Sequence, residues 1–518
     1  MPMTHEVDLL LVHANVKIQN PIERFMGVFE NQGMSIHYGM GSISAYVKAQ
    51  GFSCKVIDSN FDGQSVAETV ELISLYRPKL LGFSLNLYNL SGTLEIIKLL
   101  RQKNLYTGHI TAGGQFATSF AEDLLREFGE FDSIVIGEGE ATMAAFIQTI
   151  NHGGDWMIVR GIKYLSADKK IISTPPQQGE SDLDHLPLIE RYDIESGKML
   201  PFQQIELGRG CYGSCTFCVL DTYHRISNAP KMRRRSLPVI FDEVEKLYAR
   251  GCRIFLFRCD NFFQSQDFEA EDRYLEQFCA EIKRRKLKID FSISCRPDDL
   301  NRSRIKKLET VGLCHIFIGI ESINSDEIKL FAKGTVSQDV RKVITLLDKS
   351  RVYFECGYIF FNPWSTLENL KKSAEFILEI GPEHFPYGAY QMKIHRDTAI
   401  EKILLREGLA LRGPKILEEE IEKIYLNYEF KYLDAGYVRE ISYQLWKRLC
   451  AYVLDEYLPS RKSTQSLVMQ LNCTISTSVL SFIRDIIDAW LKGEISREGE
   501  FQVAVDEYYK NCIKKLPR

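Results

Sequence analysis

The stretch ELGRGCYGSCTFCVL, residues 206–220, places Cys211, Cys215 and Cys218 in a C-x3-C-x2-C spacing, with Phe217 directly before the third thiol. Three thiolates on one short loop can hold three corners of a [4Fe–4S] cube, which leaves the fourth iron open to a small chelating ligand. The glycines and the serine of the loop permit a close wrap around a cluster because they carry little or no side chain. A structural zinc site normally requires four protein ligands, and this loop contains no fourth Cys or His. The alternative is a chance grouping of three buried cysteines.

This spacing, with an aromatic residue before the last cysteine, resembles the signature of the radical S-adenosylmethionine (SAM) enzymes. The resemblance implies that SAM chelates the open iron through its amino and carboxylate groups. It also implies that one electron from the cluster cleaves SAM to methionine and a 5′-deoxyadenosyl radical. The signature leaves the substrate open.

The composition of the chain bounds its class. Its 518 residues exceed one ordinary core and predict two or three domains. Apolar residues make up 45% and charged residues 26%, as in soluble globular proteins, and the formal charge of −4 argues against a nucleic-acid partner. No N-terminal signal and no apolar run of about 18 residues is evident, so no membrane partner is expected. The 13 cysteines show no disulfide rhythm, which predicts a reducing, cytoplasmic location.

Residues 1–150 alternate short apolar runs with helical patterns. This rhythm predicts an α/β domain with a doubly wound parallel sheet of the Rossmann or flavodoxin type. Ligands of such sheets bind at the carboxyl ends of the strands, where the loops here are rich in Gly, Ser, Asn and Thr. The expected strands cover residues 7–12, 54–58, 80–86, 109–114 and 133–140.

The patterns YGMGSISAYVKAQGF (38–52), AGGQFATSFAEDLL (112–125) and FDSIVIGEGEA (131–141) resemble, in this order, the cobalamin-binding domains that precede radical SAM domains. No D-x-H-x-x-G occurs, so the resemblance implies base-off cobalamin without a protein histidine below the cobalt. The alternative is a flavodoxin-like domain that has lost its cofactor or binds another nucleotide. The residues expected to contact cobalamin are Asn15, Ser84, Asn86, Gly113, Gly114, Gln115, Thr118, Gly137, Glu138 and Glu140.

Residues 151–203 are expected to form a linker with a small β-hairpin, in which His185 faces solvent. Residues 204–400 alternate strands and helices again and predict a partial (β/α)6 barrel with its active face at the strand C-termini. Residues 401–518 change to a helical rhythm and predict a helical C-terminal domain. The expected barrel strands cover residues 204–208, 252–261, 289–300, 314–322, 351–363 and 385–395.

Polar residues follow the barrel strands, where an active face requires them. The family resemblance implies that SAM contacts come from these strand ends, although RCDN (258–261) replaces the Gly-Gly-Glu-like element of many members. Arg296 lies in an S-x-R-x-D pattern, and its guanidinium fork would suit the SAM carboxylate. The alternative for each residue is a hydrogen-bonded barrel end without a ligand. The residues expected to contact SAM are Phe217, Asp260, Asn261, Ser294, Arg296, Glu321 and Ile359.

Two further groups have ordinary interpretations. The basic run KMRRRS (231–236) reads as a solvated face, with the alternative that one arginine approaches a SAM carboxylate or a corrin side chain. Cys259, Cys295 and Cys356 lack cluster spacing and are interpreted as ordinary buried thiols.

The order of these parts resembles the cobalamin-dependent radical SAM enzymes over residues 1–400. The resemblance implies a methyltransferase that acts on an unactivated carbon or phosphorus centre, with a [4Fe–4S] cluster, SAM and cobalamin as cofactors. Its partners would be a small-molecule or peptide substrate and an electron donor such as flavodoxin or ferredoxin. A second possibility within the family is a cyclisation or another radical rearrangement without methyl transfer. A third is an iron–sulfur or cobalamin sensor without turnover, against which the polar barrel face argues.

Overall fold

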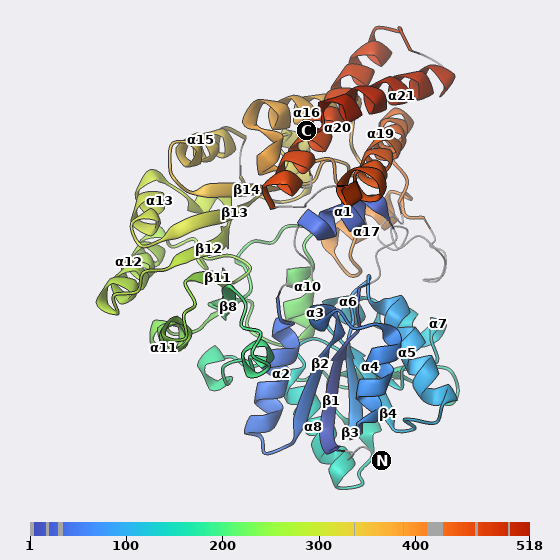
Figure 1. Cartoon of the computed structure of the whole chain (residues 1–518), viewed down its shortest axis with the longest axis vertical. Coiled ribbons are helices and arrows are strands. Elements are labelled where there is room, and N and C mark those ends of the chain that lie inside the picture. Colours follow the sequence, from blue (N-terminus) through green and yellow to red (C-terminus); the bar gives the residue numbers. More distant parts are fainter. Residues whose placement is uncertain are drawn as a thin grey trace.

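The computed structural model describes residues 5–16, 20–29, 35–335, 337–386, 388–411, 428–460, 465–495 and 498–517. An N-terminal α/β part, a partial barrel and a group of C-terminal helices make up the molecule (Figure 1). The α/β class, the parallel N-terminal sheet and the helical C-terminus predicted from the sequence are confirmed.

The N-terminal sheet has the strand order β2-β1-β3-β4-β5-β6-β7, and its first five strands are parallel. The strands β6 and β7 add on in antiparallel pairing, so the hairpin expected in the linker extends this sheet beyond residue 150. The strands are β1 (His5–His13), β2 (Cys54–Asp58), β3 (Tyr76–Ser84), β4 (His109–Gly113), β5 (Ser133–Val135), β6 (Ile162–Leu165) and β7 (Ile171–Ser173).

Both faces of this sheet are covered by helices, which explains the continuous apolar run in β1. Leu9 and Leu11 pack in the core under α2 and α8, whereas Leu10 and Val12 pack in the core under α4, α5 and α7. Figure 1 shows α2 and α8 on one side of the strands and α4 and α5 on the other. The helices are α2 (Tyr38–Ala49), α3 (Ser59–Asp62), α4 (Val66–Ser74), α5 (Leu90–Gln102), α6 (Gln115–Ser119), α7 (Ala121–Glu127) and α8 (Glu140–Asn151).

The short helix η1 (Trp156–Ile158) lies between α8 and β6. After β7 the chain crosses to the barrel and forms two short helices on the way, η2 (Leu183–His185) and α9 (Tyr192–Glu195). The His185 side chain is 70% exposed, which confirms that it faces solvent.

The barrel contains a parallel five-stranded sheet in the order β14-β13-β12-β11-β8. The expected sixth strand, residues 385–395, is reduced to one parallel bridge between Phe361 and Gln391, with Met392 N donating to Phe361 O at 2.7 Å. Its strands are β8 (Phe202–Glu206), β11 (Ile254–Arg258), β12 (Asp290–Cys295), β13 (Leu313–Glu321) and β14 (Tyr353–Tyr358); β9 (Gly208–Arg209) and β10 (Arg233–Arg234) form a separate antiparallel pair.

Helices and short 3₁₀ turns alternate with the barrel strands along the chain. They are α10 (Val219–Ile226), α11 (Leu237–Ala249), α12 (Phe268–Arg284), η3 (Pro297–Asp299), α13 (Arg302–Glu309), α14 (Ser325–Leu330), α15 (Ser337–Asp348), α16 (Leu367–Ile380) and η4 (Pro382–His384).

The C-terminal helices share one apolar core with the barrel. The helix α1 (Pro21–Phe29) joins them although it lies near the N-terminus, because Ile22, Phe25 and Met26 belong to this core (Figure 1). Residues 412–427, within the region expected to be helical, lie outside the described residues. The C-terminal elements are α17 (Ala399–Arg406), α19 (Leu433–Tyr452), η5 (Val453–Tyr457), η6 (Leu458–Ser460), α20 (Gln465–Leu491) and α21 (Glu498–Lys515).

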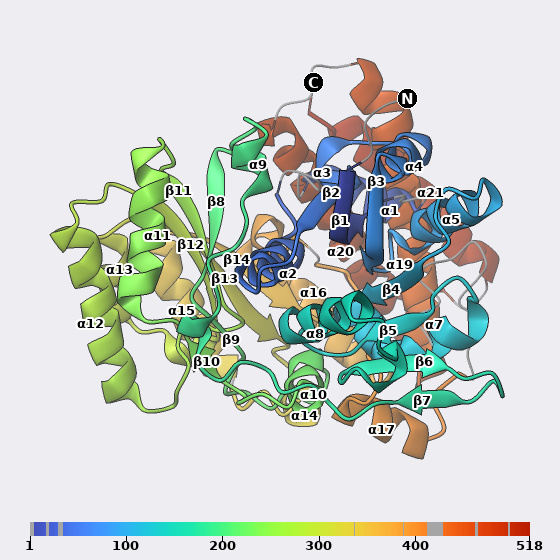
Figure 2. The same ribbon diagram turned by 90° about the horizontal axis from the view of Figure 1, so that it is seen from below.

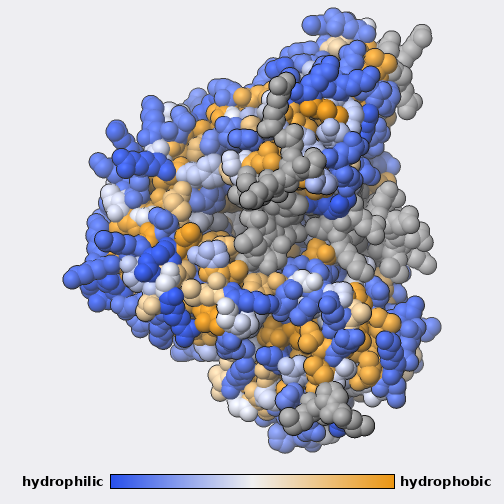
Figure 3. Space-filling view, in the orientation of Figure 1, coloured by the Kyte–Doolittle hydropathy of each residue, from blue (hydrophilic) through white to orange (hydrophobic). Residues whose placement is uncertain are grey.

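The helix α20 bears on the expectation that the chain has no membrane partner. Residues Ser466–Leu491 are long and apolar enough to cross a bilayer by length and composition. Leu471, Ile475 and Ile483 on this helix are fully buried, and α20 packs against α16 and α19 as a core helix does. On the face shown in Figure 3, hydrophilic residues predominate along the outline, with apolar residues between them.

Candidate functional site

A cavity of about 1040 Å³ lies between the N-terminal sheet and the barrel. His13, Ser84 and Asn86 line it from the carboxyl ends of β1 and β3, and Asp260 and Ser294 line it from the carboxyl ends of β11 and β12. Figure 2 shows the two sheets beside each other, with α2 between them. The ligand-binding edges of both parallel sheets therefore face one space, whose volume slightly exceeds the roughly 300–1,000 Å³ usual for ligand pockets.

A second, smaller cavity of about 260 Å³ adjoins this space and reaches down beside the N-terminal sheet. Gly82 and Gly113 leave room along its wall, since a Cβ at Gly82 would lie 3.1 Å from the Leu11 side chain. His224 of α10 lines the pocket and is 4% exposed, yet neither of its ring nitrogens has a hydrogen-bond partner among the described residues. A buried polar group without a partner costs free energy unless a ligand satisfies it, so this pocket fits a bound group with polar atoms.

The cysteine loop follows β9 at the rim of the large cavity. Gly210 adopts φ +100°, and a Cβ there would collide with the Lys231 carbonyl. Its N–H donates to Asp260 Oδ2 at 2.7 Å, so the end of β11 anchors the start of the loop. Cys211, Cys215 and Cys218 are all free and partly exposed, and burial raises the pKa of the Cys218 thiol to about 12.

The spacing of these thiols can be compared with what a single ion and a cluster require. No three His, Cys, Asp or Glu side chains among the described residues lie close enough to hold one metal ion. Three thiolates on a [4Fe–4S] cube are spaced more widely, because each binds a different iron. Metal ligation requires the thiolate form, so cluster binding would release the protons that burial retains.

Positive charge lies beside Cys215. Arg296 Nη1 is 3.7 Å from Cys215 Sγ, and the rest of the guanidinium donates to both carboxylate oxygens of Asp298 and to the Lys333 carbonyl. Burial disfavours the Lys333 ammonium, but Glu321 at 3.2 Å and Cys215 outweigh it and hold the pKa of Lys333 above its usual value. Two cations beside Cys215 place positive charge where a cluster held by thiolates would carry negative charge.

Arg296 therefore contacts the cysteine loop, and Asp298 binds its guanidinium group. Arg296 is not among the described residues that line the large cavity. Glu321 stands at a β-bulge at the end of β13 with φ +68°, and its carboxylate pairs with Lys333. A left-handed, bulged residue re-aims its side chain, which here points to Lys333.

The remaining residues expected to contact SAM divide into three groups. Asp260 and Ser294 line the large cavity. Asn261 is fully buried, accepts from Arg296 N at 3.1 Å and donates to Asp299 at 2.8 Å, so its amide is used inside the protein. Phe217 and Ile359 pack together with Phe331, Trp364 and Met392 in a small apolar cluster next to the cysteine loop.

Most residues expected to contact cobalamin line the two cavities: Ser84, Asn86, Gly113, Gly114, Gln115, Gly137, Glu138 and Glu140. Asn15 and Thr118 do not appear among the lining residues. Asn15 donates to the Gln64 carbonyl, and Thr118 accepts from Gly137 N at 3.1 Å. Gly114 is left-handed with φ +106°, which glycine alone adopts at little cost, and a Cβ there would lie 3.2 Å from the Leu85 carbonyl.

The two acidic residues of the GEGE stretch hold the domains together. Arg209 of β9 contacts Glu138 at 3.2 Å, Glu140 at 2.8 Å and Glu206 at 2.9 Å. Arg233 of β10 also pairs with Glu138. These carboxylates are therefore bound to barrel arginines as well as facing the cavity.

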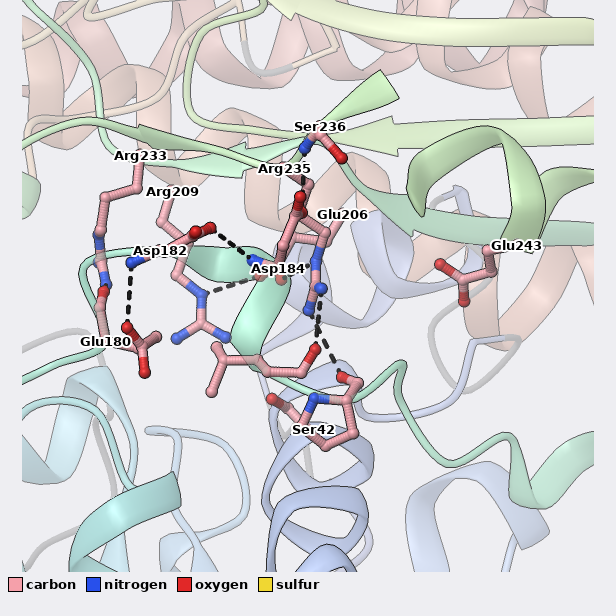
Figure 4. Close-up of polar contacts among 12 residues, drawn as sticks. Ser42, Glu180, Asp182, Asp184, Glu206, Arg209, Arg233, Arg235, Ser236 and Glu243 are labelled. Atoms are coloured by element: carbon pink, nitrogen blue, oxygen red, sulfur yellow. Dashed lines mark hydrogen bonds and ion pairs between the residues drawn. The ribbon is translucent and has the colours of Figure 1, made fainter. Parts of the chain in front are cut away.

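The solvated-face interpretation of the basic run is wrong for its arginines. The Arg233 and Arg235 side chains are each 2% exposed. Arg235 donates to Glu206 at 3.2 Å, and Ser236 N donates to Asp184 at 3.0 Å (Figure 4). Arg234 pairs with Glu271 and lies over the Tyr274 ring. The sequence of a basic run does not show which carboxylates it will meet. Here the partners are Glu138, Glu206 and Glu271, which lie on three separate segments of the chain.

Cys295 and Cys356 are buried thiols, as expected, whereas Cys259 lines the large cavity. Sequence reasoning missed His13, His37 and Asp58. Asp58 is 3% exposed; burial raises its pKa, but hydrogen bonds from His13 and from the Tyr192 hydroxyl outweigh this and leave the pKa below its usual value. The available signal was that a strand of apolar residues, LLLV, ends in a histidine.

Comparison with known protein families gives two matches. Residues 30–147 match the B12 binding domain, and residues 205–377 match the radical SAM superfamily. These two domains define a radical SAM enzyme with a cobalamin domain in front of it. The chain belongs to the cobalamin-dependent radical SAM enzymes, whose cofactors are cobalamin, SAM and a [4Fe–4S] cluster.

Two characterised proteins show what the chain is similar to in sequence. The chain is 24% identical over 362 residues to the anaerobic magnesium-protoporphyrin IX monomethyl ester cyclase of Rubrivivax gelatinosus, covering 67% of this chain and 63% of the cyclase. It is 26% identical over 305 residues to the hopanoid C-3 methylase of Methylococcus capsulatus, covering 57% of this chain and 55% of the methylase. The chain thus spans less than two thirds of the length of either relative.

The fold resembles that of the cobalamin-dependent S-adenosylmethionine radical enzyme OxsB, solved with aqua-cobalamin and S-adenosylmethionine bound. The TM-score is 0.69 at 17% identity, over 99% of this chain and 84% of OxsB. The resemblance extends through the C-terminal helices, which neither domain match reaches.

Proposed function

We propose that this protein is a cobalamin-dependent radical SAM methyltransferase that acts on an unactivated carbon or phosphorus centre of a small molecule. The observation that carries the proposal is the cavity of about 1040 Å³ bounded by the ligand-binding edges of both parallel sheets. A radical formed at the barrel edge and a methyl donor held at the N-terminal edge would then meet one substrate in one enclosure. When bound, the cofactors supply the electron, the radical and the methyl group, while the protein supplies position and electrostatics.

The chain's own residues support this arrangement by fixing the two edges relative to each other. Arg209 comes two residues before Cys211 and binds Glu138 and Glu140 of the N-terminal domain. Asp260 holds the first turn of the cysteine loop and lines the cavity. A displacement of the N-terminal domain therefore strains the cysteine loop, so the distance between the two cofactor sites is held by buried ion pairs.

Within this proposal, Asp260 and Ser294 contact SAM from the cavity wall, and Phe217 and Ile359 form the apolar side next to the cysteine loop. Arg296 and Lys333 take the role of cations that stabilise the loop thiolates, in place of the SAM carboxylate contact expected for Arg296. The residues of β3, β4 and β5 that line the cavities contact cobalamin.

A second candidate is a cyclisation or radical rearrangement without methyl transfer. It is favoured by the cyclase of Rubrivivax gelatinosus, whose similarity covers more of this chain than that of the hopanoid methylase. Both candidates need a one-electron donor such as flavodoxin or ferredoxin, and a reduced donor is consistent with the cytoplasmic location that the 13 free cysteines favour.

The experiment is an anaerobic incubation of the reconstituted, reduced protein with cobalamin and SAM labelled in its methyl group. Mass spectrometry then follows the label in cobalamin, together with S-adenosylhomocysteine and 5′-deoxyadenosine. A methyltransferase transfers the label to cobalamin and forms S-adenosylhomocysteine. Formation of 5′-deoxyadenosine with unlabelled cobalamin and no S-adenosylhomocysteine would reject methyl transfer and favour the rearrangement.

A further inference from the structure

The charged side chains of the large cavity do not cancel one another. Apart from histidines, those among the described residues that line it are Glu206, Asp260, Arg209, Arg258 and Lys393. Glu206 and Arg209 are bound to each other at 2.9 Å within the ion pairs that join the two domains. Asp260 accepts from Gly210 N and holds the cysteine loop. The remaining charges, on Arg258 and Lys393, are both positive.

Arg258 is the last residue of β11, and its exposed side chain lines the cavity. Its Nη1 donates to Gln204 Oε1 at 3.0 Å, which is a neutral partner. No ion pair joins its guanidinium to a carboxylate within the described part of the chain. Glu206 is its neighbour in the strand register, but Arg209 binds one carboxylate oxygen of Glu206 and Arg235 binds the other. Most N–H donors of Arg258 are therefore available to a ligand.

Lys393 places a second cation on another wall of the cavity. It lies two residues after Gln391, which forms the single bridge of the reduced sixth strand. Its Nζ donates to the Tyr88 hydroxyl at 3.3 Å and lies 4.9 Å from the centre of the Tyr390 ring. Tyr88 lies between β3 and α5, so this ammonium reaches the N-terminal side of the cavity.

Two histidines that line the cavity respond to these cations. Burial lowers the pKa of His37 to about 4, and His13 and Arg258 lower it further, whereas Asp58 opposes them. Burial also lowers the pKa of His395 to about 4, and the charge of Lys393 contributes. Both imidazoles are therefore neutral near neutral pH. A positive potential that disfavours an imidazolium favours an anion in the same space.

We infer that the substrate carries an anionic group, a phosphate or a carboxylate, which Arg258 binds in the positive potential of Lys393. The inference deepens the proposed function and rests on it. SAM has an ammonium and a sulfonium against one carboxylate, so it adds positive charge and suits Asp260. An anionic substrate is then the component that compensates Arg258 and Lys393. A guanidinium fork matches a phosphate or carboxylate in two hydrogen bonds, which also fixes the orientation of the substrate.

The test uses the whole protein with an oxidised cluster, bound cob(II)alamin and saturating SAM, a state in which no electron starts the reaction. Inorganic phosphate is the probe, and its ³¹P relaxation rate is measured, because the unpaired electron of cob(II)alamin speeds the relaxation of a nucleus in the same cavity. The inference predicts a saturable increase in this rate. Phosphate that relaxes no faster than with free cob(II)alamin would overturn the inference alone. Failure of the protein to bind cob(II)alamin or SAM would instead overturn the proposed function, and the inference with it.

A matched pair of variants assigns the anion to Arg258. R258M should raise the apparent Kd for phosphate about tenfold or more, because a charge-assisted pair of hydrogen bonds is lost. R253M is the control: Arg253 precedes β11 at its opposite end, donates to the backbone carbonyls of Tyr248 and Cys252, and carries the same charge. Its Kd for phosphate should equal that of the wild type.

Two results with these variants would overturn the inference. Equal weakening of phosphate binding in R258M and R253M would show that net charge, and not a site, attracts the phosphate. Weakened SAM binding in R258M by isothermal titration, with unchanged phosphate binding, would assign the guanidinium to the SAM carboxylate.

Discussion

Arg209 connects the barrel to the N-terminal domain, and replacing it with methionine should destabilise the protein markedly. The guanidinium is 15% exposed and contacts the carboxylates of Glu138, Glu140 and Glu206, each of which is 10% exposed or less. With Arg233 and Arg235, the cluster contains three arginines and three carboxylates. Arg209→Met therefore leaves one buried negative charge without compensation.

The magnitude follows from the cost of an unpaired buried charge. Removing one partner of a buried ion pair costs about 3–5 kcal/mol. Burial raises the pKa of Glu140, whereas Arg209 and the Ser42 hydroxyl lower it and prevail in the wild type. Without Arg209 the folded-state pKa of Glu140 rises above its unfolded value. The penalty is then largest at high pH, and it shrinks as the pH falls through the raised pKa and Glu140 takes up a proton.

The assay is urea unfolding followed by circular dichroism at pH 8 and pH 5. Arg285→Met is the matched control, because Arg285 is also largely buried but contacts the carboxylates of Asp242, Glu245 and Glu281, which are 59%, 56% and 22% exposed. Water can solvate those carboxylates, so the control should cost less than about 1 kcal/mol. Equal losses in the two variants, or a loss in Arg209→Met that does not shrink at pH 5, would refute the buried-charge argument.

Three further predictions concern separate parts of the molecule. Replacing the three loop cysteines with alanine should remove iron and sulfide while far-ultraviolet circular dichroism stays unchanged; a full complement of four irons in the triple variant would contradict the cluster site. Arg296→Ala should speed iron loss to a chelator several-fold, with Arg296→Lys intermediate because an ammonium cannot reproduce the fork; unchanged iron retention with weakened SAM binding would restore the SAM carboxylate role. Burial lowers the pKa of His109 to about 4 in the folded state. In the unfolded state this histidine already binds a proton when the pH falls below about 6.5. Protonation therefore favours unfolding, and up to about 3 kcal/mol of the free energy of unfolding should be lost between about pH 6.5 and 4. His109→Gln should flatten that part of the stability curve, and an unchanged slope would show that other groups cause it.

The sequence predicted those features that depend on local pattern. The apolar run of β1 and the alternation of strands and helices gave the two parallel sheets, and the cysteine spacing gave the loop at the barrel edge. The polar residues at the strand ends also predicted which edge of each sheet faces the cavity. These inferences succeed because strand direction alone decides which loops gather at one edge.

Features that depend on distant pairing were not predictable. His13 and Asp58 are 45 positions apart and meet only through the register of β1 and β2. The arginines at 233–235 find carboxylates on segments up to 95 positions away, so a run that reads as solvated becomes buried. Arg296 is also 3.7 Å from the Sγ of Cys215, which is 81 positions away, and the strand pattern that predicted a SAM contact for Arg296 does not reveal this neighbour.

The central claim is that the cluster and cobalamin face one cavity, and magnetic interaction between them tests it most directly. The protein is loaded with both cofactors, poised so that the reduced cluster and cob(II)alamin are both paramagnetic, and compared with samples that contain only one of them. Residues on both sides of the cysteine loop, Arg209 and Leu220, line the same cavities as Ser84 and Gly114 of the N-terminal sheet. The account predicts faster spin relaxation and broadened cobalt lines in the doubly loaded sample. A spectrum equal to the sum of the two single-cofactor spectra would contradict it.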